Sequence, residues 1–212
     1  MNYLITAGPT REFIDDIRFI SNLSSGRMGY ALAQAAREAG HSVVLVSGPV
    51  ALDPPEGVRL VNVVSAVEMR EAVLKTFPES DIILMCAAVA DYRPERRHTG
   101  KLKKGPDTLT LKLVKNPDIA AETGARKQSR FLVGFALEAE NAEANARSKM
   151  AAKNFDIIVL NTPAAMAAES SEVQVLFPDG SGRRIGPAAK QEIAAELIRI
   201  IDEIRPNRSR QD

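Results

Sequence analysis

Short apolar runs alternate along the chain with longer stretches in which apolar residues recur at helical spacing. Residues 3–7 form the first run and residues 41–46 the second, and each run ends at turn residues. Such runs are typical of buried strands, and apolar spacings of three and four residues predict a helix between them. We expect this helix to begin after Ser24 or Ser25 and to end at Gly40, which completes a βαβ unit.

The same alternation continues through the chain and predicts an α/β fold with a doubly wound, mostly parallel, Rossmann-like sheet. Residues 1–212 are expected to form a single domain, because no linker or internal repeat interrupts the pattern. Ligands of such sheets bind beyond the carboxyl ends of the strands, where loops 8–25 and 86–106 are polar. Further strands are predicted at residues 58–63, 81–88, 131–135 and 156–161 and in a hairpin of 172–177 with 183–185; further helices are predicted after Ser65, after Asn116, at 141–153 and at 187–204.

One segment breaks this rhythm. Leu109, Leu111 and Leu113 alternate with polar residues, which is the period of a half-buried strand. We expect residues 92–115, approximately, to form an antiparallel strand arm, or flap, added to the parallel sheet. The apolar face of such an arm requires a cover, and a second copy of the chain would supply one, so the pattern predicts a homodimer.

Composition narrows the class of protein. The 212 residues carry a net charge of +1 and include no tryptophan, so a nucleic-acid partner is not expected. The longest apolar run, residues 82–90, is far shorter than the roughly 18–20 residues that span a bilayer, so no membrane association is expected. Cys86 is the only cysteine, which rules out an intrachain disulfide and favours a reducing, cytoplasmic location.

The turn formed by Ser24, Ser25 and Gly26 is a candidate anion site, because a helix start offers free N–H groups and the positive end of the helix dipole. Gly26 removes a side chain where an oxyanion would approach, and Gly29 allows the helix to lie close to the sheet. An ordinary serine-capped helix explains the same residues equally well. The segment is not a dinucleotide G-x-G-x-x-G turn, since Gly8 lies far upstream.

Two further features follow the apolar run at residues 81–88. Asp91 is a candidate ligand for Mg²⁺ or for a base or ribose hydroxyl, although it also suits a plain turn. Residues 100–105 place three lysines, including Lys101, between two glycines, and such a loop suits a polyphosphate as well as solvent. Lys149 and Lys153 are four residues apart and therefore share one helix face.

Taken together, these segments resemble bacterial phosphopantothenoylcysteine synthetase, the ligase half of the bifunctional coenzyme A biosynthesis protein. The resemblance extends to about residue 205. It rests on six motifs in the family's order, which are AGPTR at residues 7–11, ISNLSSGRMG at 20–29, VSGPV at 46–50, AAVADY at 87–92, KLKK at 101–104 and VKNPDI at 114–119.

The resemblance implies a reaction in which CTP, with Mg²⁺, activates the carboxylate of 4′-phosphopantothenate as an acyl-cytidylate. L-Cysteine then attacks the acyl group and CMP leaves. It also implies dimerisation through the strand arm. The flavin-dependent decarboxylase half of the bifunctional protein has no counterpart here, so no flavin is expected in this chain. A preference for CTP over ATP rests on the resemblance alone.

The resemblance also assigns roles to residues. Lys101 matches the lysine of the cytidylyl step, Asn22 matches the asparagine that holds the acyl-cytidylate, and Arg18 matches an arginine near the pantothenate. By the anion argument rather than the resemblance, Ser24, Ser25 and Gly26 are expected to meet the phosphate of the substrate. Ala88 is also expected at the substrate, and Asp91 is the candidate metal ligand. The implied nucleotide contacts are Met85, Cys86, Ala87, Asp91, Lys101, Pro117, Asp118, Ile119, Ala120, Phe135, Lys149 and Lys153.

Two other classes of protein remain as alternatives. A nicotinamide-dependent oxidoreductase on the same sheet predicts a short glycine turn and an acidic residue at the end of the second strand. The second strand instead ends at Ser47 and Gly48, which lack that acid. A non-catalytic nucleotide-binding module would need neither Asn22 nor Lys101.

Overall fold

The computed structural model describes residues 1–103, 105, 108–161 and 170–205, and it confirms the α/β fold. One sheet has the strand order β12-β11-β10-β9-β6-β1-β4-β5. Six neighbouring strands of this sheet are parallel to one another, namely β10, β9, β6, β1, β4 and β5. When these six are renumbered from one to six along the chain, they lie side by side in the order 3-2-1-4-5-6, which is the Rossmann order. The strands are β1 (Asn2–Ala7), β4 (Ser42–Ser47), β5 (Arg59–Asn62), β6 (Ile82–Met85), β9 (Phe131–Leu137), β10 (Ile157–Asn161) and the antiparallel β11 (Ser170–Leu176) and β12 (Gly182–Ala189).

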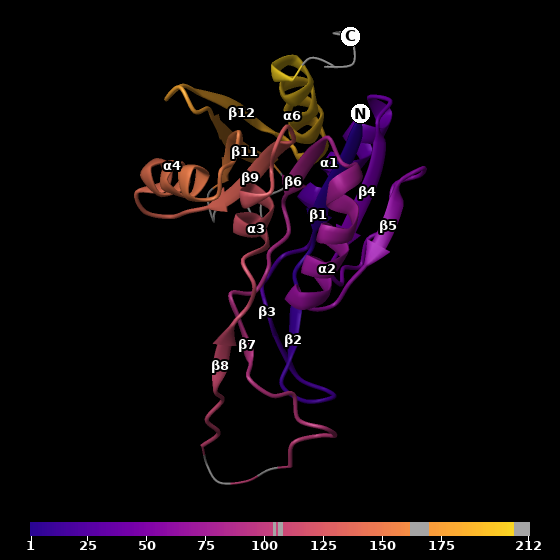
Figure 1. Ribbon diagram of the computed structural model, residues 1–212, viewed down its shortest axis with the longest axis vertical. Helices are drawn as coiled ribbons and strands as arrows, with labels where there is room; N and C mark the ends of the chain where they lie inside the picture. The colour runs from indigo at the N-terminus through magenta and orange to yellow at the C-terminus, as the bar shows by residue number, and fades with distance from the viewer. Residues whose placement is uncertain (104, 106–107, 162–169, 206–212) are drawn as a thin grey trace.

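Helices cover both faces of this sheet (Figure 1), as expected of a doubly wound fold. Tyr3 and Ile5 of β1 pack into the core shared with α1 and α6, whereas Leu4 packs into the core shared with α2, α3 and α4. Burial of alternate side chains on opposite faces explains why residues 3–5 of β1 are apolar at every position. The helices are α1 (Arg27–Glu38), α2 (Ala66–Thr76), the short 3₁₀ turn η1 (Phe77–Glu79), α3 (Ile119–Ala125), α4 (Ala142–Ala152) and α6 (Lys190–Ile204).

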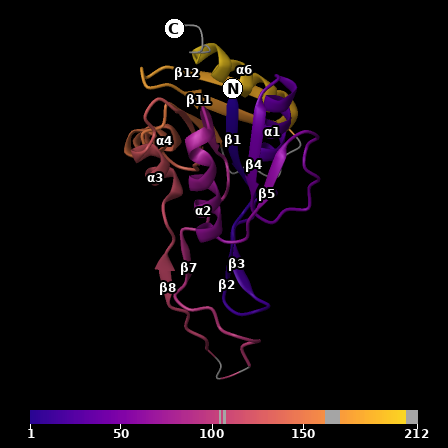
Figure 2. The same ribbon diagram turned by 45° about the vertical axis from the view of Figure 1, so that its right-hand side comes forward.

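Two antiparallel ribbons project beyond the carboxyl ends of the parallel strands (Figures 1 and 2). One is a hairpin of β2 (Arg11–Phe13) and β3 (Phe19–Ser21), which the sequence did not predict because the segment is polar. The other pairs β7 (Tyr92–Pro94) with β8 (Leu113–Lys115) and is the expected arm. The arm is shorter than predicted, because pairing begins only at residue 113.

The expected apolar face of this arm, which Leu109, Leu111 and Leu113 form, is only partly buried within one chain. Leu109 is 59% exposed and Leu113 is 42% exposed, since no element of the described chain covers them. The cover expected for this face, a second copy of the chain, stays a prediction.

Several predicted helix boundaries also require correction. Gly26, in a left-handed conformation with φ of 76°, is the N-cap of α1, so neither Ser24 nor Ser25 caps it. Asp118, whose carboxylate accepts from the Ala121 amide at 3.0 Å, caps α3 in place of Asn116. The N-cap at Ser65 is confirmed by the 3.2 Å bond from the Glu68 amide. Within the described ranges, no helix has the length and apolar character needed to cross a bilayer.

Candidate functional site

The loops after β1 and β6 meet at the point where the strand order reverses. Pro9 and Ala88 form an isolated parallel bridge. The Ala88 amide donates to the Gly8 carbonyl at 2.9 Å, and the Thr10 amide donates to the Ala88 carbonyl at 3.3 Å. A doubly wound sheet binds ligands in the crevice at this topological switch point. The main-chain bonds therefore fix the two loops that would flank a ligand.

Two buried threonines shape the loop after β6. The Thr6 hydroxyl accepts from the Ala87 amide at 3.1 Å, and the Thr10 hydroxyl accepts from the Ala90 amide at 3.0 Å. Both threonines are fully buried. Sequence reasoning missed them, because a threonine at a strand end carries no signal of its distant partner. They satisfy amides that would otherwise be buried without a partner, which holds the segment in a fixed shape.

A cavity of about 530 Å³ lies beside this loop, between the carboxyl ends of β6 and β9 and the helices α3 and α4. The structure brings ten of the predicted nucleotide contacts together in its wall, which are Met85, Ala87, Asp91, Pro117, Asp118, Ile119, Ala120, Phe135, Lys149 and Lys153. Sequence reasoning missed the other wall residues, which are Thr6, Val89, Ala90, Tyr92, Lys115, Asn116 and Phe155.

The charged groups of this cavity come mainly from α4 and from the start of α3. The half-buried Lys149 donates from Nζ to the Phe135 carbonyl at 3.0 Å, and Lys153 Nζ lies 3.0 Å from Asp118 Oδ1. Burial, followed by the nearby Lys153 charge, lowers the pKa of Lys149. Lys149 lies on α4 and Lys153 is the C-cap residue of that helix, and both line the cavity. A polyphosphate would offset the repulsion between them.

Asn116 joins the loop after β6 to the segment before α3. Its Nδ2 donates to the Ala90 carbonyl at 2.8 Å, and its Oδ1 accepts from Arg93 Nη1 at 3.1 Å. Its backbone amide also donates to the Asp91 carbonyl at 2.8 Å. The predicted capping role of Asn116 is wrong because these long-range partners occupy its side chain. Asn116 instead holds Asp91 at the mouth of the cavity.

Two of the predicted nucleotide contacts lie elsewhere. Cys86 packs against the opposite core, on the face of α1 and α6, and burial raises the pKa of its thiol to about 12. Lys101 is exposed on the loop of the arm and does not line the cavity. Successive side chains of an extended segment point to opposite faces of the sheet, so Cys86 points away from the face that its neighbours Met85 and Ala87 share.

The candidate anion turn lies on the other side of the switch point. Ser24 Oγ accepts from the Gly26 amide at 3.3 Å, and Ser25 is exposed. Asn22 Nδ2 donates to the carbonyls of Ala88 at 3.1 Å and Val89 at 3.3 Å. The structure therefore brings Asn22 and the anion turn to the loop that borders the cavity.

The close packing expected at Gly29 is confirmed. Gly29 is buried, and a Cβ atom added to it would lie 2.5 Å from the Ala7 Cβ. The absence of a side chain thus lets α1 begin directly against β1. Arg18, in contrast, lies in the β2–β3 turn, where its guanidinium contacts Asp15 and the Leu102 carbonyl.

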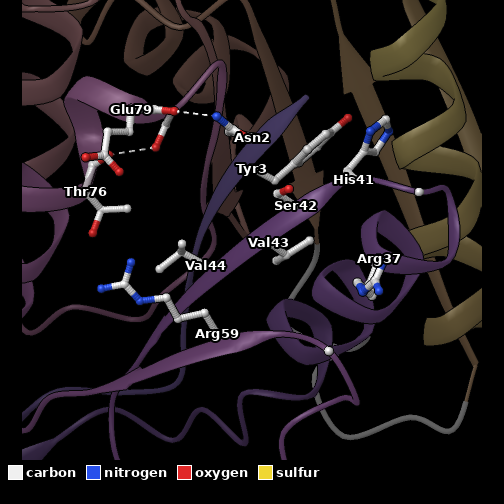
Figure 3. Close-up of a pocket in the computed structure, with 13 residues that line it drawn as sticks. Asn2, Tyr3, Arg37, His41, Ser42, Val43, Val44, Arg59, Thr76 and Glu79 are labelled. Carbon is white, nitrogen blue, oxygen red and sulfur yellow. Dashed lines mark hydrogen bonds between the residues drawn. The ribbon is translucent and has the colours of Figure 1, made fainter.

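A second cavity, of about 450 Å³, lies at the opposite ends of the parallel strands (Figure 3). Tyr3 and His41 stack there with ring centroids 4.8 Å apart, and both bond to Asp202. Burial, together with the 2.6 Å hydrogen bond that the Tyr3 hydroxyl donates to Asp202, raises the pKa of Tyr3. Because this second cavity lies at the amino ends of the parallel strands, the other cavity is the candidate functional site.

The fold defines a Rossmann-like α/β domain with a cavity beside its switch point. The chain belongs to the family described as the DNA/pantothenate metabolism flavoprotein C-terminal domain, whose model matches residues 1–204.

Three relatives illustrate the similarity. The bifunctional coenzyme A biosynthesis protein CoaBC of Vibrio cholerae is 52% identical over 206 residues, which are 94% of this chain and 52% of that protein. CoaBC of Bacillus subtilis is 45% identical over 203 residues, 93% of this chain and 50% of that protein. The crystal structure of a CoaBC C-terminal domain matches with a TM-score of 0.84 at 39% identity, covering 96% of this chain and 94% of that one. The chain thus spans about half the length of the curated relatives it matches.

Proposed function

We propose that this chain is a phosphopantothenate–cysteine ligase, which joins 4′-phosphopantothenate to L-cysteine with CTP in coenzyme A biosynthesis. The observation that carries this proposal is the pair of bonds from Asn22 to the Ala88 and Val89 carbonyls. They hold Asn22, which precedes the anion turn in the sequence, at the loop that borders the lysine-lined cavity. A ligase needs two anionic substrates side by side, and this arrangement offers one place for each.

In the first step, a carboxylate oxygen of phosphopantothenate attacks the α-phosphorus of CTP and pyrophosphate leaves. We assign the nucleotide to the 530 Å³ cavity, with Lys149 and Lys153 facing its phosphates. The phosphate of phosphopantothenate is assigned to the turn at Ser24, Ser25 and Gly26. Fixed positive groups around transferring phosphates stabilise the charge that develops there.

In the second step, the amine of cysteine attacks the acyl carbon, CMP leaves with the bonding electron pair, and the amine loses a proton. Asn22 is assigned to hold the acyl-cytidylate in this step. Lys101 is assigned to the first step. Because Lys101 lies outside the cavity of its own chain, its role requires that the arm moves or that a second copy supplies it.

The residues at the cavity fit a Mg²⁺ ion that arrives with the nucleotide. Among the described residues, no group of three or more acidic, histidine or cysteine side chains could hold a metal alone. Mg²⁺ at a nucleotide commonly takes one or two carboxylates, with phosphates and water completing its shell. Asp91, exposed at the mouth of the cavity, offers such a carboxylate. Bound there, Mg²⁺ would neutralise phosphate charge.

The proposal includes a homodimer and a cytoplasmic location. Exposed apolar side chains on the two ribbons, such as Phe19, Tyr92 and Leu113, support the homodimer. The free thiol of Cys86 supports a reducing compartment.

The test is an assay of pyrophosphate release with phosphopantothenate, cysteine and either CTP or ATP. Release with CTP that depends on phosphopantothenate supports the proposal, and no release with either nucleotide refutes it. Lys101→Gln is expected to abolish pyrophosphate release. Asn22→Asp is expected to form acyl-cytidylate but not to pass it to cysteine. Product formation at the wild-type rate by either variant would contradict the role assigned to that residue.

A further inference from the structure

The turn between β2 and β3 contains a carboxylate that no part of the proposed reaction uses. Asp15 is fully buried although it lies in a projecting ribbon. Its Oδ1 accepts from the amides of Ile17 at 2.8 Å and Arg18 at 2.7 Å. Its Oδ2 accepts from Arg18 Nε at 2.9 Å, from Arg18 Nη2 at 2.5 Å and from the Leu102 amide at 3.0 Å. A buried charge is tolerated only when it is fully bonded in this way.

The groups around Asp15 belong to two separate parts of the site. Arg18 is the residue assigned to phosphopantothenate, and Leu102 directly follows Lys101, the residue assigned to the cytidylyl step. Arg18 Nη2 also donates to the Leu102 carbonyl at 2.9 Å. Leu102 is thus linked to Arg18, which is 84 positions away, and to Asp15, which is 87 positions away. One guanidinium and one carboxylate make these links.

The neighbouring Asp16 makes a comparable but more exposed contact. Its carboxylate accepts from the Gly100 amide at 2.6 Å and pairs with Arg97 at 2.9 Å. Its side chain is 45% exposed, and it contacts neither Arg18 nor Leu102. Asp16 therefore provides a control within the same turn.

We propose that Asp15 is a positioning residue that fixes Arg18 and the backbone beside Lys101 relative to each other. The inference rests on the proposed function. A carboxylate suits this role because it only accepts hydrogen bonds, and all five of its partners are donors. An asparagine at this position would present an amide N–H₂ to one set of donors. The side chain would keep its size, but part of the network would be lost.

The experiment compares Asp15→Asn with Asp16→Asn in the full chain. Pyrophosphate release is measured with CTP and phosphopantothenate before cysteine is added, and the reaction of preformed acyl-cytidylate with cysteine is measured separately. Asp15→Asn is expected to raise the KM for phosphopantothenate and to slow pyrophosphate release, each about 10- to 100-fold, as loss of charge-assisted hydrogen bonds predicts. The cysteine step is expected to change less than about threefold in both variants. The KM for phosphopantothenate is expected to change less than about threefold in Asp16→Asn, because that variant keeps every bond between Asp15 and Arg18.

Amide exchange measured by NMR gives a readout that is independent of activity. Asp15→Asn is expected to speed exchange at the Leu102 amide but not at Gly100, and Asp16→Asn is expected to do the reverse. If Asp15→Asn does not fold, Asp15→Glu keeps the charge and is tested in the same way. The expected result is then a raised KM for phosphopantothenate with normal attack by cysteine.

Three outcomes distinguish the possible failures. Wild-type kinetics in Asp15→Asn would overturn the positioning role. If Asp15→Asn does not fold and Asp15→Glu is tested in its place, wild-type kinetics in Asp15→Glu would overturn it. An equal loss in both half-reactions, with a lower fraction of active enzyme, would show a structural role only and also overturn it. Absence of pyrophosphate release by the wild-type chain would refute the proposed function itself, whatever the exchange data show.

Discussion

Replacement of Gly29 by alanine tests whether close contact between α1 and β1 positions the anion turn. Gly29 lies in the first turn of α1, three residues after Gly26. A Cβ atom at Gly29 would lie 2.5 Å from Ala7 Cβ, 3.1 Å from Ala7 Cα and 3.2 Å from the Thr6 carbonyl oxygen. Ordinary contacts begin at 3.4 Å, so α1 would have to move by about 0.9 Å from the strand.

The size of the effect follows from two opposing terms. Overpacking of a core costs about 1–3 kcal/mol, and the upper half of that range applies because the atoms of β1 are buried main chain or adjacent to it. Alanine in place of glycine within a helix contributes up to about 1 kcal/mol in the opposite direction. We expect the free energy of unfolding of Gly29→Ala to fall by about 1–2 kcal/mol.

Urea unfolding, followed by circular dichroism, measures this loss directly. Gln34→Ala, on the exposed face of the same helix, is the control and is expected to change stability by less than about 0.5 kcal/mol. In the double variant Ala7→Gly/Gly29→Ala, the closest contact is removed, so its total loss is expected to be smaller than the sum of the two single losses. A Gly29→Ala protein as stable as the wild type, or additive losses in the double variant, would show that the close contact does not constrain α1. The displacement of α1 by about 0.9 Å is also expected to raise the KM for phosphopantothenate about tenfold.

Three further predictions concern single side chains. Because partial burial raises the pKa of Cys86 to about 12, iodoacetamide at pH 8 should label it at least about 100-fold more slowly in the folded than in the urea-unfolded chain, and equal rates would refute the raised pKa. Tyr3→Phe removes the 2.6 Å bond to the carboxylate on α6 and should lower the free energy of unfolding by about 1–2 kcal/mol; Tyr92→Phe, at an exposed position, should not, and equal losses would contradict this. Lys149→Gln should raise the KM for CTP about 10- to 100-fold while Lys75→Gln leaves it unchanged, and similar values in both would remove Lys149 from the nucleotide site.

The sign of the pH effect at Cys86 also follows from its burial. The folded state holds the thiol proton more tightly than the unfolded state, so this group favours folding below the ordinary thiol pKa. That contribution decreases as the pH rises above about 9, where the unfolded thiol ionises first. Thermal unfolding at pH 8 and pH 10, with Cys86→Ala as the reference, would measure this difference.

The sequence by itself determined the order of the strands and helices of the core. Periodicity is a local property, because burial on both faces makes β1 and β6 apolar and burial on one face gives α1 its spacing. The serine at position 65 was also readable as an N-cap, since its partner lies three residues away. The motifs also selected ten predicted nucleotide contacts that the structure gathers in the wall of one cavity.

The tertiary structure alone decided how the site is held together. Thr6 bonds to Ala87 across 81 positions, and Asn22 bonds to Ala88 across 66, so no local pattern carries either pair. The same reason explains the wrong prediction at Asn116, whose side chain serves a partner 26 positions away rather than its own helix. Side-chain polarity reveals that a partner is needed, but only the packing of distant segments selects that partner.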